Sequence, residues 1–154
     1  MLGDYVIALR HKDPSIDRAT RFPNASPTTP MARGLIVFAH GARDPLWAEP
    51  FEALVVRVRA LTPATPVRLA FLELMQPDLD AAAADLVAAG VDTIRIVPIF
   101  FGQGGHLRRD LPARVEALRA KHRGTTFACG PAVGEDGDVL DALARFCVRW
   151  LDGN

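Results

Sequence analysis

The sequence predicts an α/β fold: a single domain with an open parallel sheet and helices on both faces, a three-layer sandwich. Two observations predict it. Four short apolar runs alternate with four segments of helical period, in the order βαβαβαβα, and this alternation is typical of βαβ crossovers. The first apolar run, residues 34–40, shows no polar alternation, as expected of a strand that is buried on both faces.

The length of the chain and a change in its composition divide it into two parts. The chain has 154 residues, which is enough for one domain. Residues 1–33 are polar, rich in proline, serine and threonine, and show neither a helical nor a strand period. We therefore expect a disordered or loosely attached leader over residues 1–33 and the α/β domain over residues 34–154.

The apolar pattern places each strand and the first two helices. The strands are expected at residues 34–40, 67–73, 93–101 and 125–130. Apolar residues at helical spacing predict the first helix over residues 46–61. The second helix is expected to begin at Pro77 and to end at Gly90, because proline favours the first turn of a helix and glycine favours its C-terminal end.

The third and fourth helices follow the last two strands. Pro112 is expected in the first turn of the third helix, because a proline further inside would remove a backbone hydrogen bond. The apolar positions of these two helices are Leu111, Val115 and Leu118 in the third, and Val139, Leu143, Phe146 and Trp150 in the fourth.

The composition argues against several classes of partner. The 18 basic and 18 acidic residues give no net charge, which argues against a nucleic-acid partner. No apolar run approaches the roughly 20 residues of a membrane span, so no membrane partner is expected. Cys129 and Cys147 lack the spacing of a metal site. We expect them to be free thiols, buried or half-buried, in a cytoplasmic protein.

Titratable side chains follow the first three strands directly. His40 begins HGARDP, Glu73 begins ELMQP, and His106 lies in GQGGHLRRD. Because ligands bind beyond the carboxyl ends of parallel strands, these three loops are expected to meet at one edge of the sheet. Two histidines and one carboxylate suit a borderline divalent metal such as Fe, Co, Ni or Zn, and they also suit proton transfer near neutral pH.

Each of these residues has a plainer interpretation when it is taken alone. His40 could cap the next helix, Glu73 could be solvated at the end of its strand, and His106 could be a helix N-terminal residue without a role. Their joint placement at the ends of three strands favours a functional site.

The glycines near His106 fit a large, flat ligand better than a nucleotide. Gly102 and Gly104 match the first two positions of GxGxxG, but Leu107 occupies the third. The sequence contains neither a phosphate-binding GxxxxGK[ST] motif nor a GxSxG nucleophile motif. We expect Gly104 and Gly105 to let the backbone approach the ligand closely.

Apolar and basic residues near the same strand ends could complete a ligand site. Four apolar residues could form a wall or could simply pack in the core: Leu74, Met75, Phe100 and Phe101. Arg43, Arg108 and Arg109 could bind carboxylates through paired hydrogen bonds. Arg109 could instead be a charge on a helix surface.

Three motifs resemble those of the class II, ATP-independent tetrapyrrole chelatases. The chain is most similar to the small sirohydrochlorin cobalt, iron or nickel chelatases, over about residues 34–151 and with the motifs in the same order. The motifs are VFAHGARDP, LAFLELMQPDL and VPIFFGQGGHLRRDLP. The family often has a serine where Ala42 stands. The resemblance implies the chelatase-like version of the flavodoxin-like three-layer sandwich.

The same resemblance implies a reaction and a set of roles. It implies insertion of Co²⁺, Ni²⁺ or Fe²⁺ into sirohydrochlorin, on the route to cobalamin, sirohaem or a nickel tetrapyrrole, with no ATP and no nucleotide. It implies that His40 and His106 bind the metal and accept protons and that Glu73 assists them. Long family members carry two such domains in one chain, so a homodimer is implied for a chain with one.

Two other classes of function are open at this point. A non-catalytic module would bind and deliver a metal or a tetrapyrrole without turning it over. A flavodoxin-like signalling or nucleotide-binding domain would share the fold. The missing phosphate loop, and the two imidazoles where phosphate-binding hydroxyls would be expected, count against this last class.

Overall fold

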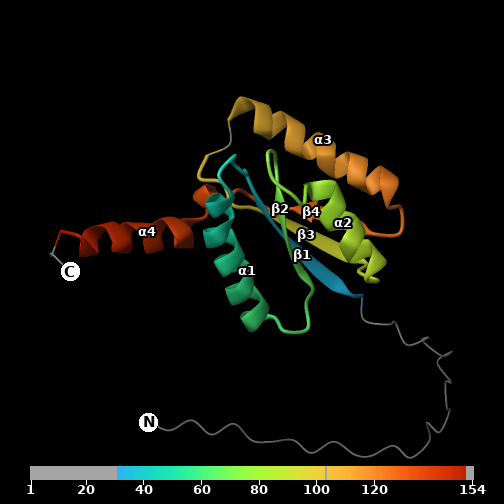
Figure 1. The fold of residues 1–154 in the computed structure, drawn as a ribbon, viewed down its shortest axis with the longest axis horizontal. Helices are drawn as coiled ribbons and strands as arrows, with labels where there is room; N and C mark the ends of the chain where they lie inside the picture. Colours follow the sequence, from blue (N-terminus) through green and yellow to red (C-terminus); the bar gives the residue numbers. More distant parts are fainter. Residues whose placement is uncertain (1–30, 103, 152–154) are drawn as a thin grey trace, which may run out of the picture.

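The computed structural model describes residues 31–102 and 104–151, and for residues 105–108 the backbone alone (Figure 1). Residues 1–30 of the expected leader lie outside this description, so the leader and the domain boundary stay predictions. Within the described residues, no helix is both long and apolar enough to cross a membrane.

Four parallel strands form one sheet in the order β2-β1-β3-β4. The strands are β1 (Arg33–Ala39), β2 (Val67–Phe71), β3 (Thr93–Pro98) and β4 (Thr126–Cys129). The open parallel sheet that the sequence predicts is confirmed. Three strands are shorter than expected, because β2 ends at Phe71, β3 ends at Pro98, and β4 spans only Thr126–Cys129.

Helices cover both faces of this sheet, also as predicted (Figure 1). Helices α2 and α3 pack on one face, and α1 packs on the other. The helices are η1 (Pro45–Ala48), α1 (Glu49–Leu61), α2 (Leu79–Ala88), α3 (Gly105–Lys121), η2 (Val133–Glu135) and α4 (Gly137–Arg149), where η marks a 3-10 helix.

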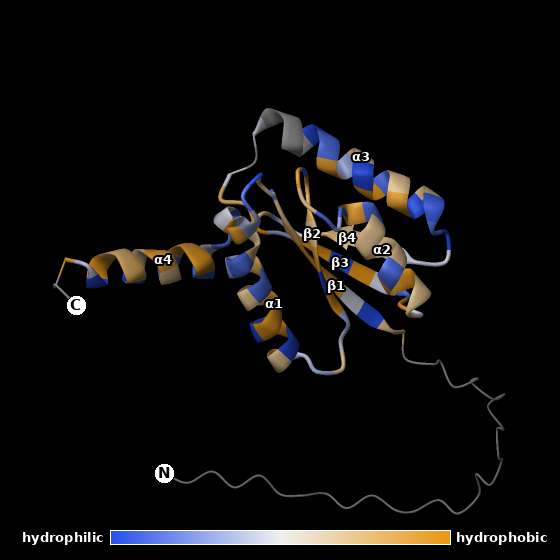
Figure 2. Ribbon diagram, in the orientation of Figure 1, coloured by the Kyte–Doolittle hydropathy of each residue, from blue (hydrophilic) through white to orange (hydrophobic). Residues whose placement is uncertain are grey.

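The two faces of the sheet carry cores of different size. Beneath α2 and α3 lies a large buried cluster, which includes Ile36, Ile96 and Leu118. Beneath α1 only Val37, Val55 and Val67 are fully buried. Figure 2 shows this apolar interior, since the strands between the helices are mostly coloured as hydrophobic. Most of the hydrophobic stabilisation therefore comes from the face that α2 and α3 cover.

The first helix differs from its prediction at the N-terminal end. Residues 45–48 form η1 rather than α-helix, and α1 begins at Glu49. Asp44 caps η1 by accepting a hydrogen bond from the backbone N–H of Leu46 at 3.0 Å. An α-helix that began at Leu46 would need a donor at Pro50, and proline has none. In the first turn of α1 the missing N–H costs nothing.

The second helix begins later than predicted. Pro77 precedes the helix, and Asp78 is the N-cap, whose carboxylate accepts from the backbone N–H of Ala81 at 2.8 Å. A carboxylate at this position satisfies one of the free N–H groups of the first turn. The predicted C-terminal end is confirmed, because Gly90 follows the last residues of the helix with a φ of +80°.

The third helix begins earlier than predicted, and this difference changes the site. It begins at Gly105, so Pro112 lies inside the helix and not in its first turn. A proline inside a helix costs about 3 kcal/mol. Burial of Leu111, Val115 and Leu118 against the sheet outweighs this cost, at about 1.5–3 kcal/mol for each fully buried side chain.

The last helix forms where its apolar spacing predicts, but it does not cover the sheet. No residue of α4 is buried. Figure 1 shows α4 pointing away from the other elements. Its N-terminal end is capped by Asp136, which accepts from the backbone N–H of Val139 at 3.1 Å.

A pair of leucines tests the assignment of the main core. Leu118→Ala should lower the free energy of unfolding by about 2–5 kcal/mol, because Leu118 is 1% exposed in the large cluster. Leu61→Ala is the matched control, since Leu61 is 83% exposed and should change stability by less than about 0.5 kcal/mol. Urea unfolding followed by circular dichroism measures both. Equal effects of the two substitutions would contradict the assignment.

Candidate functional site

The carboxyl ends of β1 and β2 are joined by backbone hydrogen bonds that continue past the strands. The N–H of Leu72 donates to the carbonyl oxygen of Ala39 at 2.8 Å, and the N–H of Glu73 donates to that of His40 at 3.0 Å. These two bonds fix the backbones of two predicted site residues, His40 and Glu73, beside each other at one edge of the sheet.

Gly41 allows this close approach. It has a φ of +86°, and a Cβ atom at this position would lie 2.0 Å from the carbonyl oxygen of Glu73. Any other residue would have to move one of the two strand ends and would adopt a backbone conformation that favours glycine. The sequence therefore needs a glycine directly after His40.

The segment after Glu73 turns sharply outward. Leu74 has a φ of +62°, which is unusual for a residue with a branched side chain. The N–H of Met75 donates to the carbonyl oxygen of Glu73 at 2.8 Å and closes the turn. The side chain of Leu74 is 64% exposed as a result. Backbone strain of this kind often marks a functional position.

His40 is exposed but is held in place by an aromatic contact. Its ring lies against the ring of Phe100, with 4.4 Å between the ring centroids. Phe100 is only 2% exposed and belongs to the large core cluster. The N–H of Ile99 donates to the carbonyl oxygen of Phe38 at 2.7 Å, which holds the chain beyond β3 next to β1. The imidazole thus rests on a rigid base at the end of β1.

The third predicted segment is helical where a loop was expected. The prediction of a loop over residues 102–110 is wrong from Gly105 on, because α3 begins there with Gly104 as its N-cap. His106 and Arg108 therefore belong to the first turn of a helix, where free backbone N–H groups lie. Their side chains lie outside the described part of the structure.

The structure brings two of the three predicted metal ligands together and leaves the third undetermined. The described residues contain no group of three or more His, Cys, Asp or Glu side chains that could hold a metal. Such a group at this edge would need the side chain of His106. The ligand set of His40, Glu73 and His106 therefore stays a prediction.

The predicted apolar wall is partly core and partly surface. Phe100 packs in the core, whereas Leu74 and Phe101 are 64% and 66% exposed. Arg43 and Arg109 are also exposed. The residues that follow β1, β2 and β3 thus expose a guanidinium group at Arg43 and apolar side chains at Leu74 and Phe101, as a flat ligand with carboxylates would require.

The sequence analysis missed a fourth segment at this edge. The N–H of Gly134, in η2, donates to the carbonyl oxygen of Phe100 at 2.9 Å. A Cβ atom at Gly134 would lie 2.1 Å from the carbonyl oxygen of Phe101. The rule that ligands bind at the carboxyl ends of strands also applies to β4, so the residues after Cys129 could have been included.

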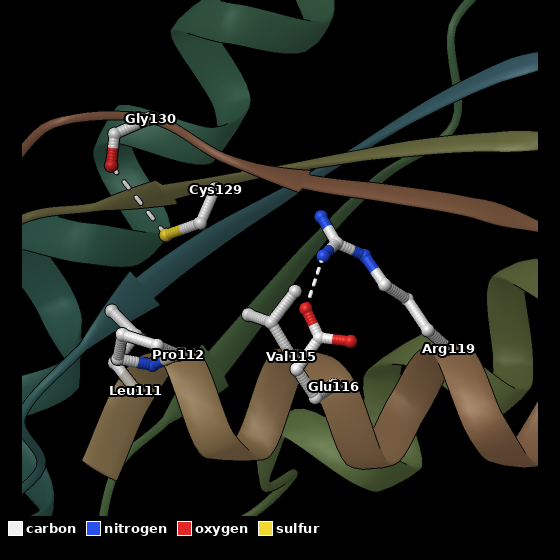
Figure 3. A pocket seen from close by; sticks show the side chains of 7 residues that line it. All are labelled: Leu111, Pro112, Val115, Glu116, Arg119, Cys129 and Gly130. Carbon is white, nitrogen blue, oxygen red and sulfur yellow. Dashed lines mark hydrogen bonds and ion pairs between the residues drawn. The ribbon is translucent and has the colours of Figure 1, made fainter. Parts of the chain in front are cut away.

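A pocket of about 310 Å³ lies between α3 and β4, away from His40 and Glu73 (Figure 3). Its lining residues are Leu111, Pro112, Val115, Glu116, Arg119, Cys129 and Gly130. Glu116 and Arg119 form an ion pair in it, and Arg119 also donates to the carbonyl oxygen of Phe127. None of the predicted site residues lines this pocket.

The two cysteines are free but are not buried. Cys129 and Cys147 are both exposed, so the expectation of buried or half-buried thiols is wrong. The reason is that β4 is an edge strand and that α4 leaves the body of the fold. Neighbouring atoms still remove part of the solvent around the Cys129 thiol, and this desolvation raises its pKa.

Known proteins resemble this chain over most of the described domain. The CbiX family model matches residues 34–147. A sirohydrochlorin cobaltochelatase of Sulfolobus acidocaldarius is 30% identical over 118 residues, covering 77% of this chain and 92% of that protein. Another from Sulfurisphaera tokodaii is 28% identical over 110 residues, covering 71% of this chain and 87% of that protein.

Solved structures show the same fold. A putative cobalamin biosynthesis CbiX protein from Marinobacter aquaeolei has a TM-score of 0.71 and 30% identity, and the match covers 79% of this chain and 99% of that one. The sirohydrochlorin chelatase SirB from Bacillus subtilis, in complex with cobalt, has a TM-score of 0.66 and 22% identity. That match covers 75% of this chain and 49% of SirB, so this chain spans about half of SirB.

Substitution of two glycines tests the contact between the strand ends. Gly41→Ala should lower the free energy of unfolding by more than about 1 kcal/mol, because the new Cβ atom would collide with the backbone of Glu73. Gly102→Ala is the control, since a Cβ atom there meets nothing within 4 Å. Urea unfolding measures both variants. An unchanged unfolding midpoint for Gly41→Ala would contradict the role of this contact.

Proposed function

Because this chain belongs to the CbiX family of class II sirohydrochlorin chelatases, we propose that it inserts a divalent metal ion into sirohydrochlorin at the carboxyl edge of its sheet. One observation carries the choice of this edge. His40 rests on the buried Phe100, and its backbone is hydrogen-bonded to that of Glu73. The motif with His106 begins α3, directly after the segment that continues β3.

The reaction sets what the protein side chains must do. The metal forms bonds to the ring nitrogens, and two protons leave the pyrrole N–H groups. The metal must first lose bound water, so its protein ligands must leave positions of the coordination shell open. Neutral imidazoles bind Co²⁺, Ni²⁺ and Fe²⁺ and accept protons near neutral pH. In this proposal His40 and His106 bind the metal first, and their nitrogens accept the pyrrole protons once the metal has passed to the ring; Glu73 assists them.

The surroundings of His40 suit the second substrate, the tetrapyrrole. Sirohydrochlorin is a flat, largely apolar ring with carboxylates at its rim. The exposed side chains of Leu74 and Phe101 offer apolar surface to the ring. In this proposal the guanidinium group of Arg43, which is exposed, binds a carboxylate of the substrate, and Arg109 belongs to the same proposed surface. Arg108 and the backbone at Gly104 and Gly105 belong to the same proposed binding surface.

Cobalt is the metal that we propose first. The curated relatives at 30% and 28% identity are both named sirohydrochlorin cobaltochelatase. Nickel and iron bind similar nitrogen and oxygen ligands, so they are the alternatives. The metal is a substrate of this reaction, and the reaction as proposed uses no ATP.

The remaining proposals concern the oligomeric state, the location in the cell and the bounds of the domain. We propose a homodimer, supported by exposed large apolar side chains such as Trp47, Phe146 and Trp150. The free thiols of Cys129 and Cys147 suit a reducing cytoplasm. We also propose residues 34–154 as the chelatase domain, in line with the family match to residues 34–147.

Metal insertion can be followed by the absorbance change of sirohydrochlorin with Co²⁺, Ni²⁺ or Fe²⁺. The wild-type chain should insert Co²⁺ fastest, and His40→Ala should lower this rate by about 100-fold or more. His122→Ala is the matched control, because His122 caps the far end of α3 and should leave the rate unchanged.

Two results of this assay would contradict the proposal. Full activity of His40→Ala would remove His40 from the site. Stoichiometric binding of Co²⁺ or sirohydrochlorin without turnover by the wild-type chain would favour the alternative, a non-catalytic module that binds and delivers its ligand.

The same assay tests the proposed role of Arg43 in binding a substrate carboxylate. Arg43→Ala should raise KM for sirohydrochlorin about fivefold with little change in kcat, as expected from the loss of one exposed ion pair of about 1 kcal/mol. Arg123→Ala is the control, because Arg123 lies in the turn between α3 and β4, far from the carboxyl ends of the strands. A fall in kcat at constant KM would contradict a role in substrate binding.

A further inference from the structure

The side chain of Phe100 connects the hydrophobic core to the proposed site. Phe100 is 2% exposed and belongs to the large buried cluster. Its ring nevertheless lies against the ring of His40, which is an exposed residue. The centroids of the two rings are 4.4 Å apart, and the ring planes are tilted by 49°. An imidazole that otherwise faces solvent therefore has a buried aromatic ring on one side.

Contacts with the core hold Phe100 in place. Its ring meets the ring of Phe38 edge to face, with 5.6 Å between the centroids and 68° between the planes, and Phe38 is completely buried. The backbone is held as well, because the N–H of Gly134 donates to the carbonyl oxygen of Phe100 at 2.9 Å. A ring that is packed closely in the core keeps one orientation, so Phe100 offers His40 a fixed surface.

The two halves of the fold repeat each other at a spacing of 60 residues, so that β1, α1 and β2 correspond to β3, α3 and β4. Every residue pair in the register of β1 with β3 has this spacing. After α1, the N–H of Thr62 donates to the carbonyl oxygen of Val58 at 3.0 Å. After α3, the N–H of His122 donates to the carbonyl oxygen of Leu118 at 2.9 Å. The two helices therefore end in the same way.

The same spacing relates two arginines at the outer edges of the sheet. Nη2 of Arg59 donates to the carbonyl oxygen of Val67 in β2 at 2.7 Å. Nη2 of Arg119 donates to the carbonyl oxygen of Phe127 in β4 at 2.6 Å. Because β2 and β4 are the edge strands, the correspondence between the halves extends from the centre of the sheet to both edges.

At the centre of the sheet, this repeat makes Phe100 the counterpart of His40. The two positions are paired when the register of β1 with β3 is continued past the strand ends, and the ring contact shows that their side chains meet. The histidine of the second half, His106, lies six residues further along the chain. A phenyl ring has no lone pair for a metal ion, so Phe100 can support the imidazole but cannot compete with it.

The contact also holds the imidazole on one side of the sheet. Phe100 belongs to the cluster beneath α2 and α3, so the His40 ring that rests on it lies toward that face. Helix α3 covers the same face and begins with the motif that contains His106. A metal ion shared by the two histidines would require this placement of the His40 ring.

We propose that Phe100 is a positioning residue, which orients the His40 imidazole for the binding of Co²⁺. This proposal rests on the proposed function, in which His40 binds the metal, and it adds the residue through which the core orients that ligand. An exposed side chain loses rotamer freedom when it binds a ligand. The ring of Phe100 removes part of this loss in advance, because it restricts the imidazole before the metal arrives.

Nuclear magnetic resonance tests the ring contact in the wild-type chain, without metal or tetrapyrrole. The carbon-bound protons of the His40 ring should be shifted from the values of a free histidine, because the Phe100 ring lies 4.4 Å away and adds its ring current. His40→Ala assigns these signals, and Phe100→Leu should move them back toward the free values. Signals of His40 at the free values in the wild type would overturn the proposal.

The affinity for Co²⁺, measured by calorimetry, separates positioning from packing. Phe100→Leu should raise the Kd for Co²⁺ about fivefold, as expected when one more side chain must be ordered on binding. Phe100→Met fills more of the same space with a flexible side chain and should act in the same way, which provides a second variant if the first does not fold.

Phe127→Leu is the matched control for these variants. Phe127 is 1% exposed in the same cluster, and its ring lies beside that of His122 at the other end of α3. The substitution should lower the free energy of unfolding as much as Phe100→Leu does and should leave the Kd for Co²⁺ unchanged. An equal rise of the Kd in both variants, or no rise in Phe100→Leu, would overturn the proposal.

The insertion assay separates this proposal from the proposed function. Phe100→Leu should raise KM for Co²⁺ about fivefold with little change in kcat, and a fall in kcat at constant KM would overturn the positioning role. A wild type that binds Co²⁺ with the expected loss in Phe100→Leu, but inserts no metal, would support the positioning role and contradict the proposed function. A Kd for Co²⁺ that His40→Ala leaves unchanged would overturn the roles of both His40 and Phe100.

Discussion

The contact between the backbones of Gly41 and Glu73 is the constraint on which the proposed site depends. The two strand ends approach so closely that a side chain at position 41 would collide with a carbonyl oxygen. The approach lets the hydrogen bonds between β1 and β2 continue to His40 and Glu73. An imidazole and a carboxylate therefore share one edge of the sheet because of backbone packing, without any direct bond between their side chains.

Two further contacts, from Phe100 and from η2, support this edge of the sheet. The buried Phe100 lies under His40, and η2 fixes the backbone beside Phe101. Both contacts come from segments that follow other strands of the same sheet. A parallel sheet brings all its carboxyl ends to one edge, so residues far apart in the sequence reach the place where a flat tetrapyrrole and a metal ion would meet.

Local patterns in the sequence predicted the elements well, and long-range packing accounts for the differences. Continuous apolar runs identified the four strands, and apolar spacing identified the helices. The pattern did not show that α3 runs through Pro112, because burial of Leu111 and Val115 decides this. It also did not show that β2 ends at Phe71, before Glu73, since the contact of Glu73 with the backbone of residues 40 and 41 joins two distant segments. The amphipathic period of α4 predicted a helix but could not show that α4 points away from the sheet.

We propose that His40 at this edge binds the metal before insertion. X-ray absorption at the cobalt K-edge, on the chain with one equivalent of Co²⁺, tests it most directly. We expect scattering from imidazole ligands in the wild type and the loss of one imidazole in His40→Ala. Identical spectra from the two proteins would contradict it.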